Sequence, residues 1–223
     1  MPLNKDEILD LLVGTGLYLV TEDAIPQQRR LDAVAQALAA GARVVQLRDK
    51  RTPRRLLLEE ARIMKSLCNQ WGAAFVINDD VALAWCCDAD GVHVGQDDLP
   101  PLEARRLLGD GKLIGLSISA VVEAEEADRL PVDYIGVGAI NATPTKVDAE
   151  LGGIGLLRRV RPLTKKPLVA IGGIDVSNAL PIFEAGADAV AVVRGVFAEP
   201  DIPDAVLRLL SIAKKAREAQ RGR

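Results

Sequence analysis

The sequence predicts a single α/β domain, a (β/α)₈ TIM barrel, from three observations. Its length of 223 residues suits one such barrel, a fold that commonly occupies ~200–250 residues. Hydrophobic residues make up 49% of the chain, which is enough for a large core. Short apolar, β-branched runs alternate with longer helical segments, and no Ser-rich linker or low-complexity block interrupts them. We therefore expect one domain over residues 1–223.

Eight short apolar runs are expected to form the strands. Each is apolar on both faces, as parallel strands covered by helices must be. In chain order the runs are 16–21, 43–48, 74–78, 91–95, 113–117, 134–138, 167–172 and 189–193. The alternative is an open, doubly wound sheet, which would usually carry a glycine-rich phosphate loop after its first strand. This chain has TEDAIP there, at 21–26, so we favour the closed barrel.

The segments between these runs carry apolar residues at helical spacing. Helices are expected at 30–40, 54–68, 121–130, 154–160, 178–185 and 202–216. An extra helix within residues 1–14 is expected to close the N-terminal end of the barrel. The basic segment 214–223 is expected to be a frayed, solvated helix end.

The composition argues against nucleic-acid and membrane partners. The net charge is −3 and aromatic residues are 3% of the chain, so neither a basic patch for DNA nor a stacking platform is expected. No run approaches the ~18 apolar residues of a membrane span, and the first residues lack a basic, apolar signal segment. We expect a cytoplasmic protein that acts on small molecules, and a homo-oligomer is compatible with the sequence.

Polar side chains follow the second predicted strand, at the end where a TIM barrel places its active site. Because side chains alternate along a strand, Gln46, Arg48 and Lys50 share one face. Two cations and an amide at the barrel mouth suit a phosphate or diphosphate, because inward-facing cations without an anion are costly. In the alternative, the strand end is solvated and Asp49 pairs with Arg48.

Acidic pairs follow the third and fourth strands. Asp79 and Asp80 come after one, and Asp97 and Asp98 come after the other. Carboxylates at the ends of adjacent strands can hold one Mg²⁺, leaving positions for substrate phosphates and water. Alternatively, one aspartate of each pair caps the helix that follows it. Spacing leaves both interpretations open.

Hydroxyl, cationic and glycine residues follow the last three strands. Thr143, Thr145 and Lys146 surround a Pro-fixed turn that could clamp an anion or could be an ordinary turn. Gly173 follows the seventh strand and Arg194 the eighth, where TIM barrels commonly bind phosphate on backbone N–H groups.

The chain contains one histidine, His93, in the middle of the fourth predicted strand between two valines. We expect it to be an interior, hydrogen-bonded residue rather than a catalyst. With a single imidazole in the chain, a Ser-His-Asp or Cys-His system is not expected. The predicted site is therefore rich in anion-binding groups and poor in proton-transfer groups.

Taken together, six motifs resemble those of the thiamine phosphate synthase family. They occur in the family's order, and the resemblance as a whole spans about residues 16–196. The motifs are QLRDK at 46–50, ND at 78–79, GVHVGQDDLP at 91–100, Ser117, TPTK at 143–146 and AIGGI at 170–174. The resemblance implies a Mg²⁺-dependent transferase that couples hydroxymethylpyrimidine diphosphate to thiazole phosphate and releases diphosphate.

The resemblance also implies roles for individual residues. Asp79 and Asp98 would hold Mg²⁺. Residues implied to bind the aminopyrimidine diphosphate are Gln46, Asn78, Arg48, Lys50, Ser117 and Lys146, the last four with catalytic roles. Residues implied to bind the thiazole phosphate are Thr143, Thr145, Gly173, Val193 and Arg194.

The chain departs from the family's pattern at three places, namely 118–119, 139–142 and Arg194. The family often has Thr-His at the first, a stretch with Pro and Phe at the second, and Ser at the third. Two alternatives follow. One is a related thiazole tautomerase, which would want an acid/base group near 118–119, where this chain has Ile and Ser. The other is a catalytically silent sensor of phosphate ligands.

Overall fold

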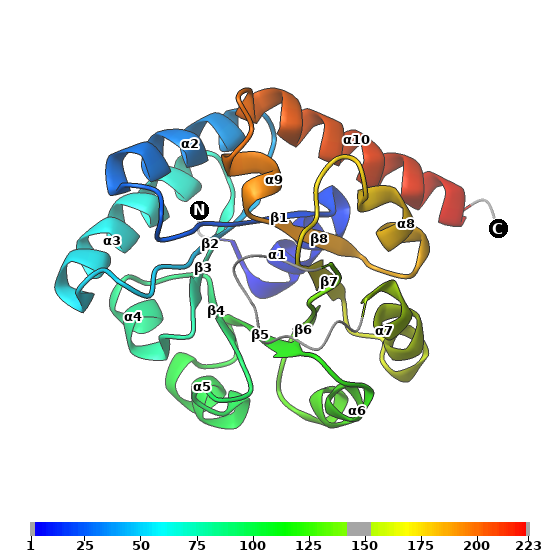
Figure 1. The fold of residues 1–223 in the computed structure, drawn as a ribbon. Helices are drawn as coiled ribbons and strands as arrows, with labels where there is room; N and C mark the ends of the chain where they lie inside the picture. Colours follow the sequence, from blue (N-terminus) through cyan, green and yellow to red (C-terminus); the bar gives the residue numbers. More distant parts are fainter. Residues whose placement is uncertain (1–2, 142–152, 222–223) are drawn as a thin grey trace.

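The computed structural model describes residues 3–141 and 153–221, and within them the chain forms a closed barrel of eight parallel strands (Figure 1). Each strand pairs with the next, and β8 closes the barrel by pairing with β1, where Val190 lies opposite Leu17. The strands are β1 (Leu17–Val20), β2 (Val44–Leu47), β3 (Ala74–Asn78), β4 (Gly91–Val94), β5 (Leu113–Ile118), β6 (Tyr134–Val137), β7 (Leu168–Ile171) and β8 (Ala189–Val192). Every strand lies within one residue of its predicted bounds, which confirms the predicted TIM barrel.

Helices surround the barrel and alternate with its strands (Figure 1). They are α1 (Lys5–Thr15), α2 (Gln27–Ala39), α3 (Arg54–Gln70), α4 (Val81–Cys86), α5 (Pro101–Leu108), α6 (Val121–Arg129), α7 (Gly153–Val160), α8 (Ala179–Glu184), α9 (Arg194–Phe197) and α10 (Ile202–Arg221), with a 3₁₀ turn, η1, at Arg161–Leu163. The sequence did not predict α9, because a helix of four residues is too short to show helical periodicity.

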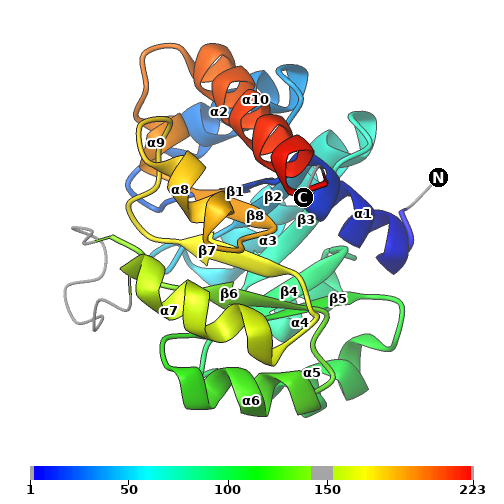
Figure 2. The same cartoon turned by 90° about the vertical axis from the view of Figure 1, so that its right-hand side faces the viewer.

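The first helix closes one end of the barrel, as predicted. Asn4 caps α1 by accepting a hydrogen bond from the Glu7 backbone N–H at 2.9 Å, and the Glu7 side chain accepts from the Asn4 N–H at 2.8 Å. Ile8 and Leu12 of this helix are buried against the interior of the barrel. Figure 2 shows α1 at one end of the barrel and α9, which follows β8, at the other end. Because α1 covers the N-terminal ends of the strands, the C-terminal ends are available for a site.

The core has two layers, as alternation along each strand requires. The outer layer lies between the strands and the surrounding helices and includes Leu19 and Val45. The inner layer fills the barrel with side chains from alternate strand positions and from α1. Its buried members are Ile8, Leu12, Tyr18, Val20, Val44, Ala74, Val76, Leu113, Tyr134, Val169, Ala189 and Ala191.

The basic C-terminal segment differs from its prediction. We expected the chain to fray from residue 214, but α10 remains helical to Arg221. Arg217 donates a hydrogen bond to the Val13 carbonyl at 2.9 Å, and Gln220 donates one to the Phe183 carbonyl at 3.1 Å, so side chains hold the helix on α1 and α8. Among the described residues, no helix is long and apolar enough to cross a membrane.

Candidate active site

A cavity of about 580 Å³ opens at the C-terminal ends of the strands. Its lining comes from all eight strands or from the loops that follow them. Among the described residues predicted from the sequence, the cavity brings together Gln46, Arg48, Lys50, Asn78, Asp79, Asp98, Ser117, Gly173, Val193 and Arg194. Thr143, Thr145 and Lys146 lie outside the residues that the structure describes.

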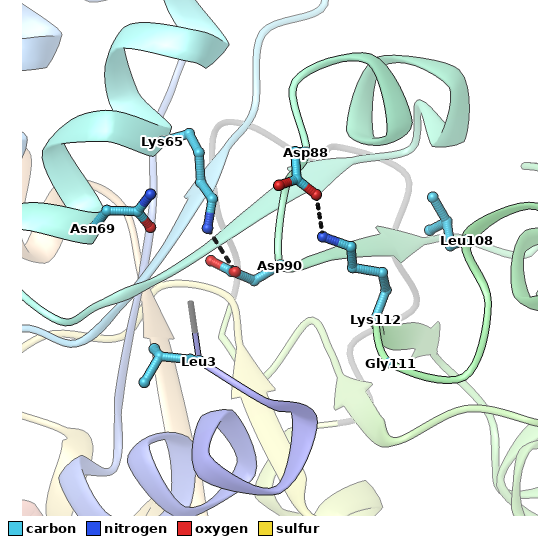
Figure 3. Close-up of a pocket in the computed structure, with 8 residues that line it drawn as sticks. All are labelled: Leu3, Lys65, Asn69, Asp88, Asp90, Leu108, Gly111 and Lys112. Atoms are coloured by element: carbon cyan, nitrogen blue, oxygen red, sulfur yellow. Dashed lines mark hydrogen bonds and ion pairs between the residues drawn. The ribbon is translucent and has the colours of Figure 1, made fainter. Parts of the chain in front are cut away.

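A second, smaller hollow of about 190 Å³ lies at the other end of the barrel (Figure 3). Its charged side chains are paired with one another. Lys65 Nζ lies 2.6 Å from Asp90 Oδ1, and Lys112 Nζ lies 2.5 Å from Asp88 Oδ1. These pairs join α3 and the residue before β5 to the segment that leads into β4. We therefore assign this hollow to the framework and the larger cavity to the active site.

The end of β2 is held in place by hydrogen bonds on both sides. Gln46 is 4% exposed, and its Nε2 donates to the Tyr18 hydroxyl at 2.8 Å. The backbone N–H of Arg48 donates to Thr21 Oγ1 at 3.0 Å, and the same hydroxyl donates back to the Arg48 carbonyl at 3.2 Å. This double contact fixes the backbone of Arg48, whose side chain lines the cavity.

The alternative of a solvated strand end required Asp49 to pair with Arg48, and the structure does not show this pair. Asp49 points away from the cavity and accepts a hydrogen bond from Arg30 Nη2 at 2.9 Å. Burial alone would raise the pKa of Asp49, but hydrogen bonds from the backbone of Thr52 and Arg51, and from Arg30, outweigh it and lower the pKa to about 2. Asp49 is therefore a buried anchor for the loop that carries Arg48 and Lys50.

The two aspartates after β3 have different roles, because one caps a helix and the other lines the cavity. Asp80 caps α4, because its Oδ1 accepts from the Leu83 backbone N–H at 2.9 Å, and it also pairs with Arg54 at 2.9 Å. Asp79 has a φ of 63°, in the left-handed region that aspartate adopts more readily than most residues. This conformation turns Asp79 into the cavity, where its Oδ2 lies 3.1 Å from Lys50 Nζ.

Of the two aspartates after β4, Asp98 is a possible metal ligand at the cavity wall, as Asp79 is. Asp98 Oδ2 accepts a hydrogen bond from the Gly95 backbone N–H at 2.7 Å. It does not cap the next helix, since the N-cap of α5 is Pro100 and makes no side-chain cap. Burial raises the pKa of Asp79, and the nearby Asp98 carboxylate adds to that rise, while Lys50 opposes it. Two carboxylates therefore meet at the cavity wall, and one cation between them would relieve their repulsion.

The donor set fits a hard cation that takes most of its ligands from a substrate. Among the described residues, no group of three or more His, Cys, Asp or Glu could hold a metal by itself. Two carboxylates plus water and phosphate oxygens match the usual site for Mg²⁺, which is bound by one or two carboxylates and keeps several waters. Asp79 and Asp98 are the residues that could hold it.

The interior side chains form a hydrogen-bonded layer at the cavity. Ser117 Oγ lies 2.8 Å from His93 Nε2, and His93 Nδ1 lies 2.9 Å from the Tyr134 hydroxyl. That hydroxyl lies 2.9 Å from the Tyr18 hydroxyl. The prediction that His93 is an interior, hydrogen-bonded residue is confirmed. Sequence reasoning missed Tyr18 and Tyr134, although both occupy inward positions of their strands.

The loop after β7 lies close to the loop after β6 and to the loop after β8, where a Cβ on Gly195 would lie 2.5 Å from the Ile174 carbonyl oxygen. Gly172 and Gly173 have φ of 115° and 58°, which favour glycine, and a Cβ on Gly172 would lie 2.9 Å from the Ala139 side chain. The Gly173 carbonyl accepts from Asn178 Nδ2 at 2.8 Å. Arg194 is the first residue of α9, and its exposed side chain stands at the cavity rim.

A closed parallel barrel whose C-terminal mouth gathers cations, two carboxylates and glycine turns defines a TIM-barrel enzyme that acts on phosphorylated small molecules. Comparison with known proteins makes the class specific. The family model described as thiamine monophosphate synthase matches residues 17–196, and the chain belongs to that family.

Similar proteins agree with this assignment. The thiamine-phosphate synthase of Chloroflexus aurantiacus is 43% identical over 209 residues, covering 93% of this chain and 96% of that protein. The thiamine-phosphate synthase of Moorella thermoacetica is 43% identical over 204 residues, covering 90% and 97%. Among solved structures, the thiamine phosphate pyrophosphorylase of Pyrococcus furiosus superposes with a TM-score of 0.83 at 32% identity, covering 92% of this chain and 98% of that one. The protein is accordingly a transferase of thiamine biosynthesis.

Proposed function

We propose that the protein joins hydroxymethylpyrimidine diphosphate to thiazole phosphate, giving thiamine phosphate and diphosphate. The observation that carries this proposal is the meeting of Arg48, Lys50, Asp79 and Asp98 in one cavity at the barrel mouth. Cations and paired carboxylates together suit a metal-bound diphosphate better than a single phosphate ester.

In this reaction the bond between the exocyclic pyrimidine carbon and the diphosphate oxygen breaks, and its electron pair leaves with the diphosphate. The amino group on the ring stabilises the resulting cation, and the thiazole nitrogen forms the new carbon–nitrogen bond. That nitrogen carries no proton, so the attack needs no general base. A site with one histidine and many anion-binding groups is therefore sufficient.

The residues around the diphosphate are proposed to stabilise it as it leaves. Arg48 lies on a fixed backbone at the end of β2, and Lys50 only needs to move from Asp79 to the incoming phosphates. Asp79 and Asp98 would hold Mg²⁺, which supplies positive charge to the leaving group. Lys146 is proposed to bind the diphosphate as well.

The two rings are proposed to occupy different sides of the cavity. Gln46, Asn78 and Ser117 contact the pyrimidine, because they extend from β2, β3 and β5 on one side of the barrel. The thiazole phosphate occupies the other side. Residues proposed to bind it are Thr143, Thr145, Gly173, Val193 and Arg194.

Neither alternative function finds support in the site. A tautomerase needs an acid/base group near 118–119, but Ile118 is buried and the Ser119 N–H donates to Glu123, which holds the start of α6. A silent sensor would not explain why the paired carboxylates and Lys50 remain together. We also propose a cytoplasmic location, and a homo-oligomer that light scattering of the purified protein would test.

The proposal is tested by mixing purified protein with both substrates and Mg²⁺ and analysing products by mass spectrometry. Thiamine phosphate should form only when both substrates are present. Lys50→Met should raise the KM for the pyrimidine diphosphate, whereas Arg51→Met, which removes an exposed cation paired with Asp23, should not. Equal effects of these two variants would mean that Lys50 does not meet the diphosphate.

A further inference from the structure

A continuous line of hydrogen bonds crosses the barrel interior from β2 to β5. It runs from Gln46 through Tyr18, Tyr134 and His93 to Ser117, with donor–acceptor distances of 2.8, 2.9, 2.9 and 2.8 Å. The first and last residues line the cavity, and Tyr134 between them is fully buried. The line therefore joins Gln46 and Ser117 through Tyr18 and His93, which also line the cavity, and through Tyr134, which does not.

The barrel leaves room for this line at two glycines. A Cβ on Gly115 of β5 would overlap the Tyr134 ring and lie 2.5 Å from His93 Nδ1. A Cβ on Gly136 of β6 would lie 2.9 Å from His93 Cε1. Neither glycine has a positive φ, so space rather than backbone conformation requires them. The absence of a side chain at these two inward positions of adjacent strands thus leaves space for the His93 and Tyr134 rings.

The donors and acceptors give the line a direction. Gln46 Nε2 can only donate, so the Tyr18 oxygen accepts. Tyr18 is buried, and an unpaired hydroxyl proton there would be costly, so it donates to Tyr134. Tyr134 then donates to His93 Nδ1. Burial raises the pKa of both tyrosines, so both keep the protons that this direction needs.

The direction ends at Ser117. An imidazole nitrogen that accepts a hydrogen bond carries no proton, so a neutral His93 has its proton on Nε2 and donates it to Ser117 Oγ. Ser117 then offers its own O–H to the cavity as a donor. At the other end, one of the two N–H groups of the Gln46 amide is engaged by Tyr18, and the amide's carbonyl oxygen is the acceptor that Gln46 offers to the cavity.

We propose that Tyr18 and Tyr134 are positioning residues that, through His93 in its Nε2–H form, fix Gln46 as an acceptor and Ser117 as a donor toward an aminopyrimidine ring. This inference rests on the proposed function. An aminopyrimidine presents the complementary set, since its amino group donates and its ring nitrogens accept. The line would therefore select the orientation of the ring, and Tyr134 would contribute to that selection from behind the cavity lining.

Because His93 is the one histidine in the sequence, nitrogen-15 NMR of histidine-labelled protein reports its tautomer without overlap. The wild-type protein without substrates should show the Nε2–H tautomer. Tyr134→Phe removes the donor to Nδ1 but keeps the ring, and it should give a mixture of tautomers. The control Thr164→Val removes a buried hydroxyl that donates to Asp128 at 2.6 Å, far from this line of hydrogen bonds, and it should leave the spectrum unchanged.

Kinetics supply the second measurement. Tyr134→Phe and Tyr18→Phe should each lower kcat/KM for the pyrimidine diphosphate about 2- to 12-fold, the usual worth of one hydrogen bond, and leave the KM for thiazole phosphate unchanged.

An Nδ1–H tautomer in the wild type would reverse the direction of the hydrogen bonds and overturn the proposal. Unchanged spectra and kinetics in both variants would also overturn it. If Tyr134→Phe does not fold, the wild-type spectrum and Tyr18→Phe decide. Absence of coupling by the wild-type protein would instead refute the proposed function, because the tautomer is measured without turnover.

Discussion

Arg30 Nη2 of α2 lies 2.9 Å from Asp49 Oδ2, directly behind the loop that presents Arg48 and Lys50 to the cavity. Arg30 Nε also donates to Glu60 Oε1 of α3 at 2.7 Å. The side chains of Arg30, Asp49 and Glu60 are 3%, 2% and 1% exposed. A buried ionic cluster therefore ties two helices to the loop that carries Arg48 and Lys50.

Removing the cation from this cluster should be strongly destabilising. Arg30→Met leaves two buried carboxylates without their partner, and losing one member of a buried ion pair typically costs about 3–5 kcal/mol. Arg55→Met is the matched control, because Arg55 pairs with Glu59 on the exposed side of α3 and such pairs contribute about 0–1 kcal/mol. The free energy of unfolding in urea measures both. Similar losses in the two variants would show that the cluster does not stabilise the fold.

The same cluster predicts a pH dependence of stability. The pKa of Asp49 falls from an ordinary 3.8 to about 2 in the folded protein, so folding is favoured while Asp49 is ionised. Its contribution, about 2 kcal/mol, is present above pH 4 and is lost as the pH falls toward 2. Asp49→Asn should flatten the fall in unfolding free energy over that interval. An unchanged slope would contradict the lowered pKa.

Asp79 and Asp80 are neighbours with different expected effects. Asp79→Asn replaces a proposed metal ligand by a neutral amide, so the Mg²⁺ concentration for half-maximal activity should rise at least about 10-fold, and Asp98→Asn should behave alike. Asp80→Asn keeps a good cap on α4 and should leave that concentration unchanged. Titration of activity with Mg²⁺ measures all three, with Asp97→Asn as a further control. A large effect confined to Asp97 or Asp80 would place the metal elsewhere.

Arg194 tests the thiazole side of the cavity. Its exposed side chain stands at the rim, where one charge-assisted contact is worth roughly 0.5–1.5 kcal/mol. Arg194→Ser should raise the KM for thiazole phosphate about 2- to 12-fold, by the same estimate, and leave the KM for the pyrimidine diphosphate unchanged. Steady-state kinetics with each substrate varied in turn measures the difference. A large gain in activity would mean that Arg194 obstructs the cavity, which would favour the sensor.

The strands could be predicted closely because each is a short apolar run with polar or glycine residues at its ends. Alternation within β2 correctly placed Gln46 inward, and the family resemblance singled out Asp79, which lines the cavity. Spacing could not show which of Asp79 and Asp80 caps α4 and which lines the cavity. The answer depends on the exact residue at which α4 begins. Spacing also could not find Arg30 as the partner of Asp49, since α2 must first pack beside α3.

The line of hydrogen bonds from Gln46 to Ser117 could not be predicted from the sequence for a different reason. In an alternating strand pattern, Tyr18 and Tyr134 look like ordinary core residues, and the glycines opposite them look like turn or strand interruptions. Only the closed barrel brings side chains from five strands into one line. A pairing of inward tyrosines with inward glycines on neighbouring strands is the signal that could have indicated it.

The central claim is that this barrel mouth couples two ring substrates by displacing a metal-bound diphosphate. The most direct measurement follows thiamine phosphate and diphosphate together while Mg²⁺ is removed by chelation and then restored. We predict equal amounts of the two products, loss of both on chelation, and recovery of both when Mg²⁺ returns. Full activity after complete chelation, or proton exchange on thiazole carboxylate phosphate without any coupling, would contradict the account.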